Sequence, residues 1–130
     1  MNLIVDRYNL DKKFISAGQL KIDEKNHTTI LTYTDNDINI SASGLHHPIK
    51  ALESLRLKLE EDFNSVIAIN GCRSDTAYRP TGGYGTYIIE TGKQATSSVS
   101  LFEPTKAIEK LCKVEEHEVA YDAWLKSLGF

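Results

Sequence analysis

The segment FISAGQLKIDEKNHTTILTYTDNDINISAS, residues 14–43, determines the fold class, because it holds three strand-like runs separated by short polar turns. Residues 14–22 and 38–43 mix apolar side chains with intervening polar ones, and residues 28–34 are rich in β-branched and aromatic types. These patterns favour β-strands, and the connecting sequences DEKN and DND supply turn residues. We therefore predict an antiparallel meander with one face toward the core and the other toward water.

A helix is predicted directly after the meander. Pro48 suits the first helical position, and no glycine interrupts residues 48–63. Apolar side chains recur there at steps of three and four residues, namely Ile49, Leu52, Leu55, Leu59 and Phe63. Such spacing places them on one face of a helix that can pack on the sheet.

Further strands are predicted in the second half of the chain. Residues 65–70, SVIAIN, form a short apolar run that is typical of a central strand. Residues 85–91 and 97–103 predict two more strands that meet near Gly92.

The C-terminal region predicts a second main helix. Residues 105–114 fit either a short helix or a strand and turn. Residues 115–128 begin with acids, carry an apolar stripe and are followed by Gly129 at the position that favours glycine after a helix. Residues 1–130 therefore predict a single α+β domain, a mostly antiparallel β-sheet with two main helices packed on it.

The bulk composition narrows the function classes. The chain has 130 residues, of which 41% are hydrophobic, and a formal net charge of −3, so its overall field does not attract nucleic acid. No apolar run approaches the ~20 residues that a membrane span needs, and we expect a cytoplasmic protein with no membrane partner. Cys72 and Cys112 are expected to be free, buried thiols.

A loop rich in glycine, tyrosine and arginine, NGCRSDTAYRPTGGYGTY at residues 70–87, is the main candidate for function. Its glycines lack the lysine and the following helix of a phosphate-binding loop, and neither the histidines nor the cysteines have the spacing of metal ligands. We expect no catalytic, cofactor or metal site. Tyr and Arg are favoured anchors of interfaces, so a partner-facing loop is one interpretation. A small enzyme or ligand-binding module centred on Cys72, Arg73 and Asp75 is the alternative.

Four segments of the chain resemble a family of small bacterial immunity proteins of contact-dependent growth inhibition and related polymorphic toxin systems. The segments are LRLKLEEDFNSVIAINGCRSD, RPTGGYGTY, FEPT and VEEHEVAYDAWLKSL, and the resemblance covers roughly residues 52–128. Its motifs are an Asn-Gly-Ala/Cys-Arg-x-Asp element, a glycine-rich loop and a terminal Trp-x-x-Ser-Leu helix. Cys72 and His117 depart from the family pattern, in which alanine and glutamine are expected at these positions.

The resemblance implies a cytoplasmic protein, a monomer or weak dimer, that binds the C-terminal domain of one cognate toxin, of nuclease type, and blocks it without cofactor or turnover. It also implies that the matching positions define the fold: Asn70, Gly71, Arg73, Asp75, Gly82, Gly83, Gly85 and Trp124. Specificity for one toxin is expected in residues that vary, such as the tyrosines and the acidic turns. The candidates for partner contact are Asp35, Asp37, Arg73, Asp75, Tyr78, Arg79 and Tyr84.

Overall fold

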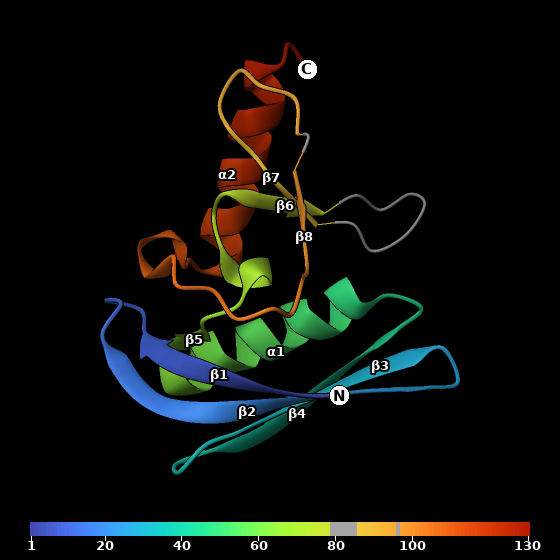
Figure 1. Cartoon of the computed structure of the whole chain (residues 1–130), viewed down its shortest axis with the longest axis vertical. Helices are drawn as coiled ribbons and strands as arrows, with labels where there is room; N and C mark the ends of the chain where they lie inside the picture. Colours follow the sequence, from blue (N-terminus) through green and yellow to red (C-terminus); the bar gives the residue numbers. More distant parts are fainter. Residues whose placement is uncertain (79–85, 96) are drawn as a thin grey trace.

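The computed structural model describes residues 1–78, 86–95 and 97–130, and these residues form an α+β fold (Figure 1). The strands are β1 (Asn2–Asn9), β2 (Phe14–Lys25), β3 (Thr28–Thr34), β4 (Asn39–Leu45), β5 (Ser65–Ile67), β6 (Thr76–Tyr78), β7 (Thr86–Ile88) and β8 (Ser98–Val99). The helices are α1 (Pro48–Phe63) and α2 (Val114–Ser127), with two short 3-10 turns, η1 (Asn70–Cys72) and η2 (Ile108–Lys110). Within the described residues, no helix is long and apolar enough to cross a membrane.

The first layer is an antiparallel sheet of five strands in the order β4-β3-β2-β1-β5. The predicted meander is confirmed as β2, β3 and β4, with Ile38 and Ala42 buried and Ser41 and Ser43 exposed. β1 was not predicted, although its burial alternates around Val5. It pairs along most of its length with the first half of β2 and adds a central strand.

The prediction that residues 65–70 form a central strand is wrong. Only residues 65–67 are a strand, and β5 pairs with β1 at the edge of the sheet. All three of its residues are nevertheless buried. The apolar run therefore reflects coverage by α1, rather than a neighbouring strand on each side.

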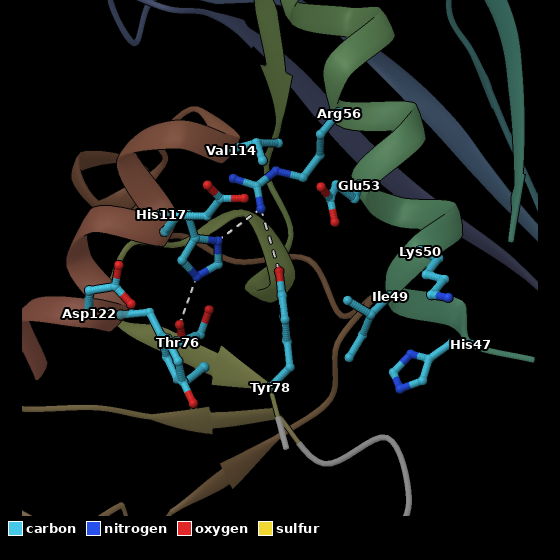
Figure 2. A pocket seen from close by; sticks show the side chains of 13 residues that line it. His47, Ile49, Lys50, Glu53, Arg56, Thr76, Tyr78, Val114, His117 and Asp122 are labelled. Atoms are coloured by element: carbon cyan, nitrogen blue, oxygen red, sulfur yellow. Dashed lines mark hydrogen bonds between the residues drawn. The ribbon is translucent and has the colours of Figure 1, made fainter. Parts of the chain in front are cut away.

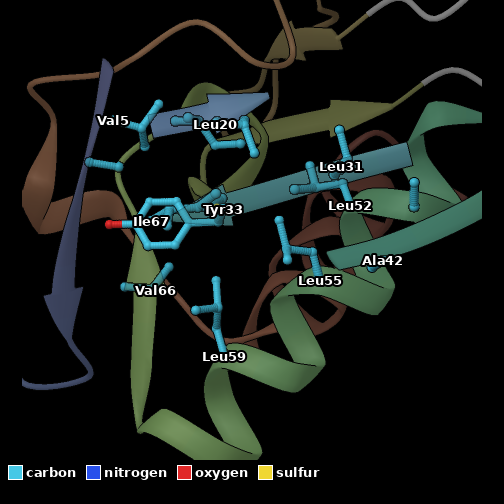
Figure 3. Close-up of a cluster of buried hydrophobic side chains, with 14 of the residues drawn as sticks. Val5, Leu20, Leu31, Tyr33, Ala42, Leu52, Leu55, Leu59, Val66 and Ile67 are labelled. Carbon is cyan, nitrogen blue, oxygen red and sulfur yellow. The ribbon is translucent and has the colours of Figure 1, made fainter. Parts of the chain in front are cut away.

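The core lies between α1 and one face of the five-stranded sheet. Leu52, Leu55 and Leu59 of the helix meet Leu31 and Tyr33 of β3 (Figure 3). Each of these five side chains is at most 1% exposed. The predicted apolar stripe of α1 is thus the face that is removed from water, and its burial drives the packing of helix on sheet.

The second layer holds the small sheet β6-β7-β8 and α2 (Figure 1). α2 confirms the predicted second helix and Gly129 follows it with a φ of +94°, but the helix extends away from the large sheet. Only Val114 and His117 of α2 are buried. Residues 105–114, for which two alternatives were open, contain η2 and then a short bridge from Leu111 to Arg73.

A buried ion pair joins β1 to the turn between β3 and β4. Arg7 is 4% exposed, and its Nε donates to Oδ2 of Asp35 at 2.7 Å. The Tyr33 hydroxyl donates to the same oxygen at 3.0 Å, and the backbone N–H groups of Asp37 and Ile38 donate to Oδ1. Burial opposes ionisation of Asp35, but these hydrogen bonds outweigh it and lower the pKa of its carboxyl.

Replacing Asp35 with alanine is expected to destabilise the protein by about 3–5 kcal/mol, because it removes the buried carboxylate that pairs with Arg7 and leaves this guanidinium with only the more distant, exposed Asp37 among its described ion-pair partners. The matched control is Asp37→Ala, because the Asp37 side chain is 67% exposed and lies 3.6 Å from Arg7. We expect the control to change the free energy of unfolding by less than about 1 kcal/mol. Urea unfolding monitored by circular dichroism measures both values. Equal losses in the two variants would contradict the structural role of Asp35.

Candidate functional site

A pocket of about 630 Å³ lies where α1, β6 and α2 meet (Figure 2). Apolar and aromatic side chains form much of its wall, namely Ile49, Ala77, Tyr78, Val114 and Tyr121. Charged side chains stand at its mouth, namely Lys50 and Glu53 from α1 and Glu118 and Asp122 from α2. A concave, largely apolar cavity with a few polar groups is the usual form of a binding site.

Arg56 of α1 lies at the inner end of this pocket and is only 4% exposed. Its Nη1 donates to the Gly71 carbonyl at 3.1 Å and to Nδ1 of His117 at 2.9 Å, and its Nη2 donates to the Cys112 carbonyl at 2.9 Å. The Tyr78 hydroxyl also donates to the Gly71 carbonyl. One guanidinium therefore connects α1 to η1, to the segment before α2 and to α2 itself.

His117 of α2 is the second buried polar residue of the pocket. Its Nε2 lies 2.7 Å from the Thr76 carbonyl and donates to it, while Nδ1 accepts from Arg56. This arrangement fits the neutral imidazole with its proton on Nε2. Burial, and then the neighbouring Arg56 charge, lower the pKa of His117 from 6.5 to about 4. His117 is therefore uncharged at neutral pH and ties α2 to β6.

The start of α2 is held by a carboxylate of α1. Both Glu60 oxygens lie 3.3 Å from the Val114 N–H, and the Glu116 carboxylate accepts from the Lys113 N–H at 3.0 Å. Negative charge at the first turn of a helix is favourable, because the N–H groups there have no partner within the helix. Burial raises the pKa of Glu60 despite its bond to Val114. Glu60 thus positions the first turn of α2.

Arg73 and Asp75 form a bidentate ion pair within the candidate loop. Arg73 Nε and Nη2 donate to the two Asp75 oxygens, each at 2.7 Å, and Nη1 lies 3.3 Å from Oδ1 of Asn70. The side chains are 15% and 20% exposed. Burial opposes ionisation of Asp75, but the bonds and charge of Arg73 prevail and lower its pKa. Neither residue lines the pocket, and the pair fixes the loop after η1.

Cys72 and Cys112 are both free, buried thiols, as predicted, and Cys72 is completely buried. Burial raises the pKa of Cys72 from 9.0 to about 11, although the nearby Arg56 charge acts in the opposite direction. A thiol that stays protonated and has no exposed surface is a poor nucleophile. Cys72, Arg73 and Asp75 therefore do not share an open site, because the thiol lies in the core and the ion pair lies near the surface.

The other predicted contact residues lie in different environments. Tyr78 is half-buried and lines the pocket. Asp35 was predicted to face a partner, and this prediction is wrong, because its side chain is 0% exposed and is bonded to Arg7. Asp37 remains exposed. Arg79 and Tyr84 lie outside the described residues, as do Gly82, Gly83 and Gly85, which the resemblance implies to be fold-defining.

Several matching positions of the resemblance have structural roles. A Cβ atom on Gly71 would lie 2.6 Å from Cδ2 of Leu52 and 2.8 Å from Cδ1 of Leu101, so no larger residue fits without rearrangement. Asn70 is buried and its amide donates to the Ser100 carbonyl at 3.0 Å. Trp124 donates from its indole to the Lys93 carbonyl at 2.9 Å. Asn70 and Gly71 thus have structural roles in the core, and Trp124 has one contact near the surface.

A second concave surface of about 350 Å³ continues from the pocket along α2. The two cavities share Ala77, Tyr78 and Tyr121. The second adds apolar and aromatic side chains, namely Tyr87, Trp124, Leu125, Leu128 and Phe130. We call the two cavities together the α2 groove.

The polar residues of the pocket, Arg56 and His117, were not predicted, and neither was Tyr121 as a contact. A signal for Arg56 exists in the sequence, because it follows the apolar Leu52 by four residues and so falls on the buried face of α1. His117 has the same spacing before Tyr121, so the two side chains lie on one face of α2.

Within the part of the chain that the structure describes, no three His, Cys, Asp or Glu side chains are grouped as metal ligands. No protein-family model matches the chain, and no curated protein matches it either.

The buried His117 predicts a specific pH dependence of stability. Its pKa is lower in the folded protein, so the unfolded chain binds the proton more tightly. The stability that neutral His117 provides is complete above pH 6.5 and is lost as the pH falls from 6.5 toward about 4. The shift corresponds to a loss of about 3 kcal/mol.

The matched control is His117→Gln, because a glutamine can accept from Arg56 and donate to Thr76 but does not titrate. Urea unfolding of both proteins between neutral pH and pH ~4 gives the difference in free energy of unfolding at each pH. We expect this difference to shift by about 3 kcal/mol in favour of the variant as the pH falls. A difference that stays constant with pH would contradict a buried, neutral His117.

Proposed function

We propose that this chain is a non-catalytic binding protein that neutralises a cognate toxin domain and contacts it through the α2 groove. The observation that carries the proposal is the groove itself, a continuous concave surface walled by Tyr78, Tyr121 and Trp124. Aromatic side chains of this kind supply much of the binding energy in protein interfaces. The resemblance of residues 52–128 to immunity proteins supplies the class of partner.

The hydrogen bonds in the pocket favour recognition over turnover. Nη1 and Nη2 of Arg56 are directed at Gly71, His117 and Cys112. Both ring nitrogens of His117 also have hydrogen-bond partners inside the protein. The groups best suited to acid–base chemistry therefore hold the layers together. A surface fixed in this way loses little conformational freedom on binding, which favours affinity.

The charge of α2 matches a basic partner. The helix carries four carboxylates, those of Glu115, Glu116, Glu118 and Asp122, against the single lysine Lys126. Nucleases of polymorphic toxin systems must bind phosphate groups, so a toxin of this type presents positive charge. Opposite charge accelerates association and selects the correct partner.

The partner is sought by pull-down with this chain from the bacterial lysate, and the toxin domain that is captured is then made as a catalytically inactive variant. We expect the two proteins to form a stoichiometric complex with nanomolar affinity in titration calorimetry. Addition of this chain should also abolish the activity of the active toxin domain. The absence of a complex at micromolar concentrations would contradict the proposed function.

The contact surface is tested with Tyr121→Ala, which removes an aromatic wall that is shared by both cavities. The affinity for the toxin domain should fall by about 30-fold, the effect of an interface residue worth ~2 kcal/mol. The matched control is Ile4→Ala on the outer face of β1, because Ile4 is 78% exposed and lines neither cavity of the groove. If Ile4→Ala lowered the affinity and Tyr121→Ala did not, the contact surface would be the outer face of the sheet and not the α2 groove. Circular dichroism shows whether each variant is folded.

A further inference from the structure

We infer that the pocket between α1 and α2 receives an arginine side chain of the partner, held between carboxylates of the two helices and against the rings of Tyr78 and Tyr121. The inference rests on the proposed function for the identity of the partner. The chemistry of the pocket, which carries the inference, is independent of that identity.

Carboxylates occupy both sides of the pocket mouth. Glu53 projects from α1, and Asp122 projects from α2 on the opposite side (Figure 2). Glu118 adds a third carboxylate one helical turn before Asp122. All three side chains are exposed, so they meet any group that enters before it reaches the apolar wall. A cationic head between the two helices is attracted from both sides.

Two cationic side chains of the chain also line the pocket, and their repulsion limits where the partner's guanidinium can bind. Lys50 stands on the α1 side near His47, away from α2 (Figure 2). Arg56 is buried at the inner end, with its η-nitrogens bonded to carbonyl oxygens and to His117. Its repulsion keeps a second cation at the mouth, close to the carboxylates. An anionic occupant would have to pass those carboxylates to reach a guanidinium whose η-nitrogens are already engaged.

The aromatic walls select arginine over lysine. Tyr78 and Tyr121 both line the pocket, Tyr78 from β6 and Tyr121 from α2. A planar guanidinium stacks on aromatic faces and binds a carboxylate through two parallel hydrogen bonds, whereas an ammonium is a compact and strongly hydrated charge. The aliphatic part of an arginine side chain also suits the apolar wall that includes Ile49 and Val114.

The pocket is tested without the toxin by nuclear magnetic resonance of the isotopically labelled protein. The probes are N-acetyl-arginine amide, N-acetyl-lysine amide and N-acetyl-glutamate amide. We expect the arginine probe to shift the backbone amide signals of Glu53, Tyr78 and Tyr121, with an apparent affinity at least several-fold above that of the lysine probe. The glutamate probe should leave these signals unchanged. A glutamate probe that shifts them as strongly as the arginine probe would overturn the inference.

Charge-reversal variants test the role of the carboxylates. In Glu53→Lys with Asp122→Lys, the affinity for the arginine probe should fall at least tenfold. The matched control is Glu61→Lys with Glu103→Lys, which makes the same change in net charge at two exposed residues outside the pocket. We expect the control to bind the probe within twofold of the unaltered protein. Equal losses in the two double variants would show a general field effect and would overturn the inference.

The probe and the toxin domain separate the two proposals. If the toxin domain binds but the arginine probe leaves the pocket signals unchanged, the proposed function stands and the arginine pocket is wrong. If the probe binds in the pocket and the toxin domain does not bind, the pocket stands and the proposed partner is wrong. If both bind, excess toxin domain should displace the probe, and simultaneous binding would overturn the inference.

Discussion

The buried guanidinium of Arg56 is the constraint around which the second layer of the protein is arranged. A charge in the interior is costly unless most of its N–H groups meet acceptors, so nearby backbone carbonyls have to point at it. The carbonyls of Gly71 and Cys112 do so, and His117 contributes a ring nitrogen. Each acceptor comes from a different segment. The positions of η1, of the chain before α2 and of α2 itself are therefore set by one side chain of α1.

The same arrangement gives the pocket its shape. η1 can approach α1 only because Gly71 has no side chain to meet Leu52. Its carbonyl then accepts from both Arg56 and Tyr78, which places the tyrosine ring in the pocket wall. Glu60 fixes the first turn of α2 from the other side. The pocket is therefore rigid where it meets the core. The exposed side chains at its mouth take no part in this arrangement, so their charges can change by substitution without disturbing it.

Local patterns predicted the elements better than their tertiary roles. The periodicity of residues 48–63 and the alternation around Ile38 gave α1 and β4, because one side of each element is buried. β1 was missed, since its inward positions include the charged Arg7, whose partner Asp35 is distant in sequence. The edge position of β5 and the burial of Asp35 depend on which segments cover them. The pocket combines residues from three elements, and only Tyr78 belonged to the predicted set.

The anchoring of α2 by its first turn separates two kinds of mutational tolerance. Val114 and His117 are its buried residues, whereas the distal half is held by contacts such as that of Trp124 with Lys93. Substitutions in the distal half therefore remove few core contacts and lie on the surface that forms the groove. A lineage can alter this half with little cost to folding, while Arg56 and its acceptors keep the helix in place. Because the first turn of α2 is constrained and its distal half is not, the binding surface can diverge in sequence faster than the fold.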